Sequence, residues 1–158
     1  MQLYFLRHGL ADWPNWDPAR DHERPLTDEG MEKMKAEAKA IKRLGLELDA
    51  ILSSPFVRAQ QTAQPVAERL GLNVVEEAAL APGFDLKRLQ AVLKRHPDAR
   101  AIMLVGHEPD FSRTIGQLIG GGRVAMKKGG LARVDLEAPD PPQGELVWLL
   151  APKVLIEG

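Results

Sequence analysis

Short apolar runs recur along the chain, and amphipathic stretches separate most of them. Apolar runs of this length predict buried strands, and they fall at residues 2–7, 49–54, 72–76, 100–106, 131–137 and 145–150. In the stretches between them, apolar residues return every three or four positions, which predicts helices with one buried face. The pattern therefore predicts a chain in which strands alternate with helices.

The first two helices have clear start and stop signals. The first follows Thr27, an expected N-cap, and ends at Gly45. The second is expected to begin with Ser54 as N-cap and Pro55 as first helical residue. Capping is the expected role of Ser54 because the G-x-S-x-G elbow that surrounds a nucleophilic serine is absent. Pro65 is expected to break or kink this second helix because it has no N–H to donate.

Two further helices complete the predicted fold. One follows Asp85, and the other begins at Pro109. Alternating strands and helices predict an α/β fold, a three-layer α/β/α sandwich with a mainly parallel central sheet. No long helix separates the last two strands, so we expect them to form a C-terminal antiparallel hairpin across the Pro-rich segment 137–144. The length suits one domain, 1–158.

The composition limits the possible partners. There are 21 basic and 22 acidic residues, so no overall charge favours nucleic acid or a membrane surface. Cysteine is absent, which excludes disulfides, thiolate nucleophiles and cysteine metal sites. No apolar run approaches the roughly 18 residues of a membrane span, and the N-terminus lacks a signal pattern. We expect a cytoplasmic monomer that binds neither nucleic acid nor membrane.

Cationic and imidazole side chains follow three of the predicted strands. Arg7 and His8 end the first strand, Arg58 lies shortly after the second, and His107 follows the fourth. In such sheets, ligands bind outside the carboxyl ends of the strands. A lone histidine at a strand end is more often a packing or capping residue, but two arginines and two histidines from separate segments predict a site for an anionic group.

The segments that carry these residues read LRHG, SSPFVRAQQTA and VGHEP, in that order. Together they resemble the histidine phosphatase superfamily, also called the phosphoglycerate mutase-like proteins. The segment RPLTDEG from Arg24 and the small size are most similar to the SixA-like branch, the protein-phosphohistidine phosphatases. The resemblance implies a catalytic set of His8, Arg7, Arg58 and His107.

The chemistry of these residue types agrees with that resemblance. Phosphoryl transfer depends mainly on positioning and on charge stabilisation, which the guanidinium forks of Arg7 and Arg58 can supply. A neutral His8 can attack phosphorus and hold the group as phosphohistidine, while His107 binds a further oxygen. No HExxH pattern, EF-hand loop or Walker sequence is present, so we expect no metal and no cofactor.

The long connection between residues 10 and 26 has two interpretations. It contains two of the three tryptophans, and loops of this length without secondary structure are usually functional or mobile. Trp13, Trp16, Arg20 and Arg24 either contact a phosphorylated partner at the rim of the pocket, or belong to a loop packed on its own tryptophans. The sequence leaves both interpretations open.

The chain departs from the family pattern after the third strand. Many members have a glutamate there that protonates the leaving oxygen, whereas Ala79 lies near that position here. Glu77 and Asp85 are candidate acids, although Asp85 is also expected to cap a helix. A site without a strong acid favours phosphohistidine over alkyl phosphates.

Three functions therefore remain open. The first is a metal-independent phosphatase for a phosphorylated histidine-containing protein, such as a member of a phosphorelay. The second is a phosphatase for small phosphomonoesters, and the third is a phosphate-binding docking module without turnover.

Overall fold

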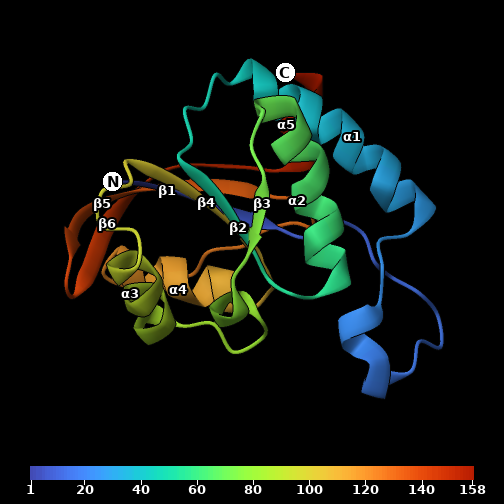
Figure 1. Cartoon of the computed structure of the whole chain (residues 1–158), viewed down its shortest axis with the longest axis horizontal. Coiled ribbons are helices and arrows are strands. Elements are labelled where there is room, and N and C mark those ends of the chain that lie inside the picture. The colour runs from blue at the N-terminus through green and yellow to red at the C-terminus, as the bar shows by residue number, and fades with distance from the viewer.

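The computed structural model describes residues 1–158 and contains one six-stranded sheet (Figure 1). The strands are β1 (Gln2–Arg7), β2 (Ala50–Ser53), β3 (Val74–Glu76), β4 (Ala101–Gly106), β5 (Leu131–Pro139) and β6 (Pro142–Leu150). Their order across the sheet is β3-β2-β4-β1-β5-β6. The first four strands are parallel, whereas β5 pairs antiparallel with both β1 and β6. The predicted mainly parallel sheet and C-terminal hairpin are confirmed.

Helices cover both faces of this sheet. They are α1 (Asp28–Arg43), α2 (Val57–Leu70), α3 (Leu86–Lys94), α4 (Asp110–Leu118) and α5 (Pro152–Glu157), with short 3₁₀ helices η1 (Pro18–Glu23) and η2 (Ala78–Leu80). Figure 1 shows α1 and α2 on one side of the sheet and α3 and α4 on the other. The predicted three-layer α/β/α sandwich is therefore confirmed. None of the helices has the length and apolar content needed to cross a membrane.

The central strand β1 supplies both cores. Leu3 and Phe5 belong to the core under α3 and α4, and Tyr4 and Leu6 to the core under α1 and α2. The Phe5 ring meets Phe111 of α4 edge-on, with 5.2 Å between the ring centroids. A strand buried on both faces needs apolar residues at every position, which explains the unbroken apolar run at the start of the sequence.

Two helices begin where the sequence predicts. The Thr27 hydroxyl accepts a hydrogen bond from the Gly30 N–H at the start of α1, at 3.0 Å. The Asp85 carboxylate accepts one from the Arg88 N–H at the start of α3, at 2.9 Å. These bonds satisfy N–H groups that have no partner within the helix itself.

The predicted start of α2 is wrong. The helix begins at Val57 after Phe56, and Ser54 is not its cap. The Ser54 N–H still bonds to the Val105 carbonyl of β4 at 2.9 Å, so the chain remains extended at this residue. Its hydroxyl accepts a hydrogen bond from the Phe56 N–H and contacts His107.

Of the break or kink expected at Pro65, the break does not occur, because α2 continues through Pro65 to Leu70. The burial of Ala63, Val66 and Ala67 against the sheet outweighs the single hydrogen bond that proline removes. Three elements were missed altogether: η1 within the long connection, η2 after β3, and α5 after the hairpin. None is longer than six residues, which is too short for a clear periodic pattern.

Candidate active site

Three neighbouring strands end at one edge of the sheet and bring the predicted residues together. Arg7 and His8 follow β1, His107 follows β4, and Arg58 lies in the first turn of α2 after β2. The order β2-β4-β1 makes these strand ends adjacent. The His8 N–H bonds to the Gly106 carbonyl at 3.0 Å, and the two histidine rings lie 5.3 Å apart. The sequence therefore predicted this grouping correctly.

The ring of His8 is held at both nitrogens. Nδ1 lies 2.8 Å from the carbonyl oxygen of Gly9, and the Arg58 Nε–H donates to Nε2 at 3.3 Å. Because a carbonyl only accepts, Nδ1 carries the proton and Nε2 carries the lone pair. Burial lowers the pKa of His8 to about 4, and the charges of Arg58 and Arg7 add to the effect although the bond to Gly9 opposes it. His8 is therefore a neutral imidazole at pH 7.

His107 is held from the opposite side. Its Nε2 lies 2.7 Å from the Ser54 hydroxyl, whereas its buried Nδ1 has no partner. The Ser54 hydroxyl oxygen accepts a hydrogen bond from the Phe56 N–H, and the hydroxyl proton needs an acceptor of its own. We infer that the hydroxyl donates this proton to the His107 Nε2, so the ring proton of His107 is on Nδ1. Burial lowers the pKa of His107 to about 3, with smaller contributions from His8 and Arg58. His107 is therefore also neutral at pH 7.

Arg58 connects this pair to the connection between residues 10 and 26. Beyond His8, its Nη1 donates to the Asp21 carbonyl at 2.8 Å and its Nη2 to the Asp21 carboxylate at 3.1 Å. The guanidinium also lies over the Phe56 ring, 5.0 Å from the centroid. Burial alone would raise the pKa of Asp21, but Arg58 and Arg24 outweigh it and the pKa is lowered. Asp21 is therefore an ionised partner of a buried arginine.

Asp21 was not predicted from the sequence. The available signal was an acidic residue between two arginines, in the segment DPARDHER. Such patterns are common on solvated surfaces, where neighbouring charges pair with each other. Only the fold reveals that η1 places Asp21 against Arg58, far away along the chain.

Arg7 and Thr62 complete the set of contacts. The Arg7 Nη1 donates to the Met126 carbonyl at 2.8 Å, while its buried Nε has no partner. The Thr62 hydroxyl accepts from the Gly9 N–H at 2.9 Å and donates to the Arg58 carbonyl at 2.8 Å. Thr62 thus ties the segment that carries His8 to the helix that carries Arg58. No group of three or more His, Cys, Asp or Glu side chains is arranged to hold a metal ion.

Comparison with known proteins identifies the family. The sequence profile described as histidine phosphatase superfamily (branch 1) matches residues 3–82. This chain belongs to the histidine phosphatase superfamily.

Similar proteins place it in the SixA-like branch. The chain is 29% identical to phosphohistidine phosphatase SixA of Escherichia coli, over 96% of this chain and 94% of that one. A solved structure of the protein histidine phosphatase SixA with tungstate has a TM-score of 0.83 at 28% identity and covers 97% of this chain and 98% of its own. An uncharacterized protein of Picosynechococcus is 37% identical over 99% of both chains. The resemblance inferred from the sequence motifs is confirmed.

The two tryptophans of the connection are bonded within it. Trp13 donates its indole N–H to the Pro25 carbonyl and Trp16 to the Arg20 carbonyl, at 2.8 and 2.9 Å. Their rings lie 6.5 Å apart, and both also line an open cavity of about 530 Å³ together with Asp21 and other residues of this connection. The loop of this histidine phosphatase is therefore packed on its own tryptophans, and contact between these residues and a phosphorylated partner stays a prediction.

The side chains of the two arginines in the connection, Arg20 and Arg24, have different bonding partners. The Arg24 Nε donates to the Asp21 carboxylate at 3.1 Å, so Arg24 lies on the same carboxylate as Arg58. Arg20 instead pairs with Glu23 at 2.6 Å and is mostly exposed. The fold thus brings Arg24, but not Arg20, to the arginine and carboxylate cluster of the site.

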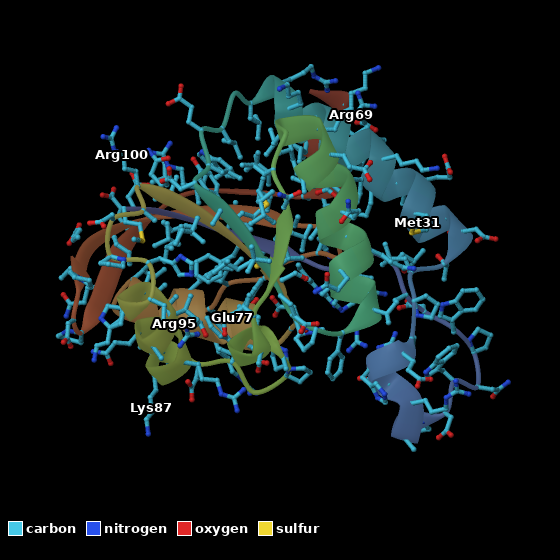
Figure 2. All side chains as sticks on the ribbon, viewed as in Figure 1. Met31, Arg69, Glu77, Lys87, Arg95 and Arg100 are labelled. Carbon is cyan, nitrogen blue, oxygen red and sulfur yellow. The ribbon has the colours of Figure 1, made fainter.

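The two candidate acids have structural partners. The Glu77 carboxylate pairs with Arg95 at 2.7 Å and accepts from the Ala79 N–H at 3.1 Å (Figure 2). Burial would raise the pKa of Glu77, but the bonds from Arg95 and Ala79 outweigh it and the pKa is lowered. Asp85 is the N-cap of α3. Both carboxyl groups are therefore engaged in local structure.

Proposed function

We propose that this histidine phosphatase hydrolyses phosphohistidine in a partner protein, through a phosphohistidine intermediate on His8, without a metal ion. The observation that carries the proposal is the state of the His8 ring. Nδ1 is protonated toward Gly9, and Nε2 presents its lone pair in a cluster of arginines. A nucleophilic imidazole needs this neutral form, and the lowered pKa keeps it available at pH 7.

Three groups around His8 have the right chemistry to hold phosphoryl oxygens. The Arg7 Nε and the His107 Nδ1 are buried nitrogens without partners, and the Arg58 guanidinium lies against His8 itself. In the proposed reaction they stabilise the charge that spreads over the equatorial oxygens. The arginines supply this charge, so the proposed step uses no metal.

The reaction takes place in two balanced steps. First, the His8 Nε2 forms a bond to phosphorus while the bond from phosphorus to the leaving nitrogen or oxygen breaks and that atom keeps the electron pair. Second, a water oxygen forms a bond to phosphorus while the bond from phosphorus to the His8 Nε2 breaks and Nε2 keeps the electron pair. The protons of the water leave with inorganic phosphate or pass to solvent, and the ring returns to its neutral form. The leaving group needs a proton in the first step, and this requirement distinguishes the possible substrates.

The candidate acids support phosphohistidine as the substrate. Glu77 is ionised and paired with Arg95, and Asp85 caps α3, so neither is poised to protonate an alkoxide. A phosphohistidine can arrive with its ring already protonated, because imidazole has a pKa of about 6.5, and it then leaves as a neutral group. A leaving alcohol has no such proton of its own. The name and similarity of Escherichia coli SixA support the same substrate.

A comparison of three substrate types tests the proposal. We expect the protein, with chelator present, to cleave a phosphohistidine-containing protein and an activated aryl phosphate, and to be poor with sugar phosphates. Labelled phosphate should be trapped on His8 in an adduct that is labile to acid and stable to base. His8→Asn should abolish both trapping and turnover, whereas the matched control His96→Asn, just after the C-cap of α3, should retain both.

Each alternative predicts a different result. Efficient hydrolysis of an alkyl phosphate that Asp85→Asn destroys would indicate a small-molecule phosphatase with a working acid. Binding of phosphate without turnover of any substrate would indicate a docking module. Unchanged hydrolysis by His8→Asn would refute the assignment of the nucleophile.

A further inference from the structure

A second cavity, of about 590 Å³, lies between α1, α5 and the turn that precedes β5. Leu10, Met34 and Ile156 contribute its apolar walls. None of the four residues proposed for catalysis lines it. Its volume falls in the range of small-molecule sites, which combine apolar walls with a few polar groups.

Glu37 of α1 lines this cavity and has no role in the proposed reaction. The residue is only 1% exposed, and its buried Oε1 has no hydrogen-bond partner. The Glu37 Oε2 lies close to the backbone of Gly129: a Cβ atom added to Gly129 would be 2.7 Å from this oxygen. A buried carboxyl without a partner is costly, so a group of this kind calls for an explanation.

The protonation of Glu37 defines what it can bind. Burial raises the pKa of Glu37 to about 8, so the carboxyl is mainly neutral at pH 7. A neutral carboxyl presents one O–H donor and one acceptor side by side. A hydroxyl group, which also donates and accepts, matches this pair.

Lysines surround the same cavity. Of the four that line it, Lys33 pairs with Glu29 at 3.0 Å and Lys128 pairs with Asp12. Lys127 and Lys153 have no carboxylate partner. Two unpaired ammonium groups at an apolar cavity favour an anionic ligand.

We propose that this cavity binds a small organic anion with an apolar body and a hydroxyl group, whose anionic end is held by Lys127 and Lys153 and whose hydroxyl bonds to Glu37. The cavity adjoins the proposed catalytic segment through the main chain. Gly9 lines it, and the N–H of Gly129 donates to the His8 carbonyl at 3.1 Å. Binding therefore takes place next to the nucleophile without using its side chain.

A titration with 6-hydroxyhexanoate tests this site in the whole protein. The measurement is the ¹H–¹⁵N spectrum of labelled protein in saturating inorganic phosphate, which keeps the proposed phosphate site occupied. We expect saturable shifts at Gly9, Glu37 and Gly129. Hexanoate, which lacks the hydroxyl, and 1,6-hexanediol, which lacks the charge, should each bind about fivefold more weakly, the effect of one hydrogen bond or one partly exposed charge contact.

Variants of the protein test the contacts at the two ends of the ligand separately. Glu37→Leu should weaken 6-hydroxyhexanoate about fivefold and leave hexanoate unchanged, while Glu37→Gln, which keeps a donor and an acceptor, should retain the preference for the hydroxyl. Lys127→Met with Lys153→Met should weaken both anions, and Lys39→Met, on the exposed face of α1, should weaken neither. Thermal melting verifies that each variant is folded.

Two results would overturn the proposal. One is the absence of saturable shifts at Gly9, Glu37 and Gly129 in the folded wild-type protein. The other is a folded Glu37→Leu variant that still prefers 6-hydroxyhexanoate to hexanoate. The titration needs no turnover, so its outcome is independent of the proposed phosphatase activity.

Discussion

The Arg58 Nε donates to the His8 Nε2 at 3.3 Å, which ties the arginine of α2 to the histidine that follows β1. Because this bond uses Nε, the two terminal nitrogens extend past the ring and reach Asp21. The guanidinium therefore contacts the proposed nucleophile and the surrounding segment at the same time. A single ammonium nitrogen has no comparable fork.

This geometry predicts that charge alone does not replace Arg58. Arg58→Lys should lower kcat on the order of 10²-fold, the scale of losing one preorganised donor. Steady-state kinetics on an activated aryl phosphate measures the effect. Arg69→Lys, on the exposed side of the same helix (Figure 2), is the matched control and should be unchanged. A folded Arg58→Lys enzyme with wild-type kcat would exclude Arg58 from the phosphate site.

Ser54 is expected to set the tautomer of His107. Ser54→Ala removes the hydroxyl that bonds to Nε2, so the ring proton is no longer directed to Nδ1. We expect ¹⁵N spectra of the ring to show a mixture of tautomers and kcat to fall about tenfold. Ser112→Ala removes another buried hydroxyl, one without a partner, and should change neither quantity. An unchanged tautomer in Ser54→Ala would refute this positioning role.

The buried histidines predict a loss of stability in acid. The pKa of His8 is about 4 in the native protein against 6.5 for a free imidazole, so between these pH values the unfolded chain binds a proton that the native state does not. The stability contributed by the neutral ring is complete above pH 6.5 and is lost as the pH falls toward 4. Urea unfolding at pH 7 and 4.5 measures it.

His8→Asn removes this titration. Between pH 7 and 4.5, the free energy of unfolding should fall for both proteins, but the fall should be about 2–3 kcal/mol smaller for His8→Asn than for the wild type. His96→Asn serves as the control and should follow the wild type. Equal acid sensitivity of His8→Asn and wild type would mean that His8 is not buried in its neutral form.

Asp21 is expected to compete with phosphate. Its carboxylate bonds to both Arg58 and Arg24, so Asp21→Asn should leave more cationic charge for an added anion. We expect calorimetry at low salt to show about threefold tighter binding of inorganic phosphate, with a smaller difference at high salt. Glu23→Gln, whose partner is Arg20, is the control. Weaker binding by Asp21→Asn would mean instead that the carboxylate holds Arg58 in place.

Most of the fold could be predicted from the sequence because local and global signals agree. The apolar run of β1, the Thr27 cap and the Asp85 cap each favour the structure that forms. Predictions based on a single residue were less reliable. Pro65 and Ser54 have strong local preferences, but the packing of α2 and the pairing of the chain with β4 override them.

The candidate site divides in the same way. His8, Arg58 and His107 follow strands, so strand order alone brings them together. Asp21, Ser54 and Glu37 were not assigned to any site, because their importance depends on contacts between segments distant in sequence or on burial. Sequence patterns report which face of an element is buried, but not which polar groups meet across the molecule.

The two sides of the site, the end of β1 and the helix η1, differ in how well they tolerate substitutions. His8 follows β1, which is paired on both edges, whereas η1 buries none of its side chains. Substitutions in η1 that leave Asp21 intact therefore cost the fold little stability, since exposed positions seldom contribute much. Over evolutionary time, the exposed residues of η1 other than Asp21 can therefore change among relatives of this chain while the chemistry at the end of β1 stays the same.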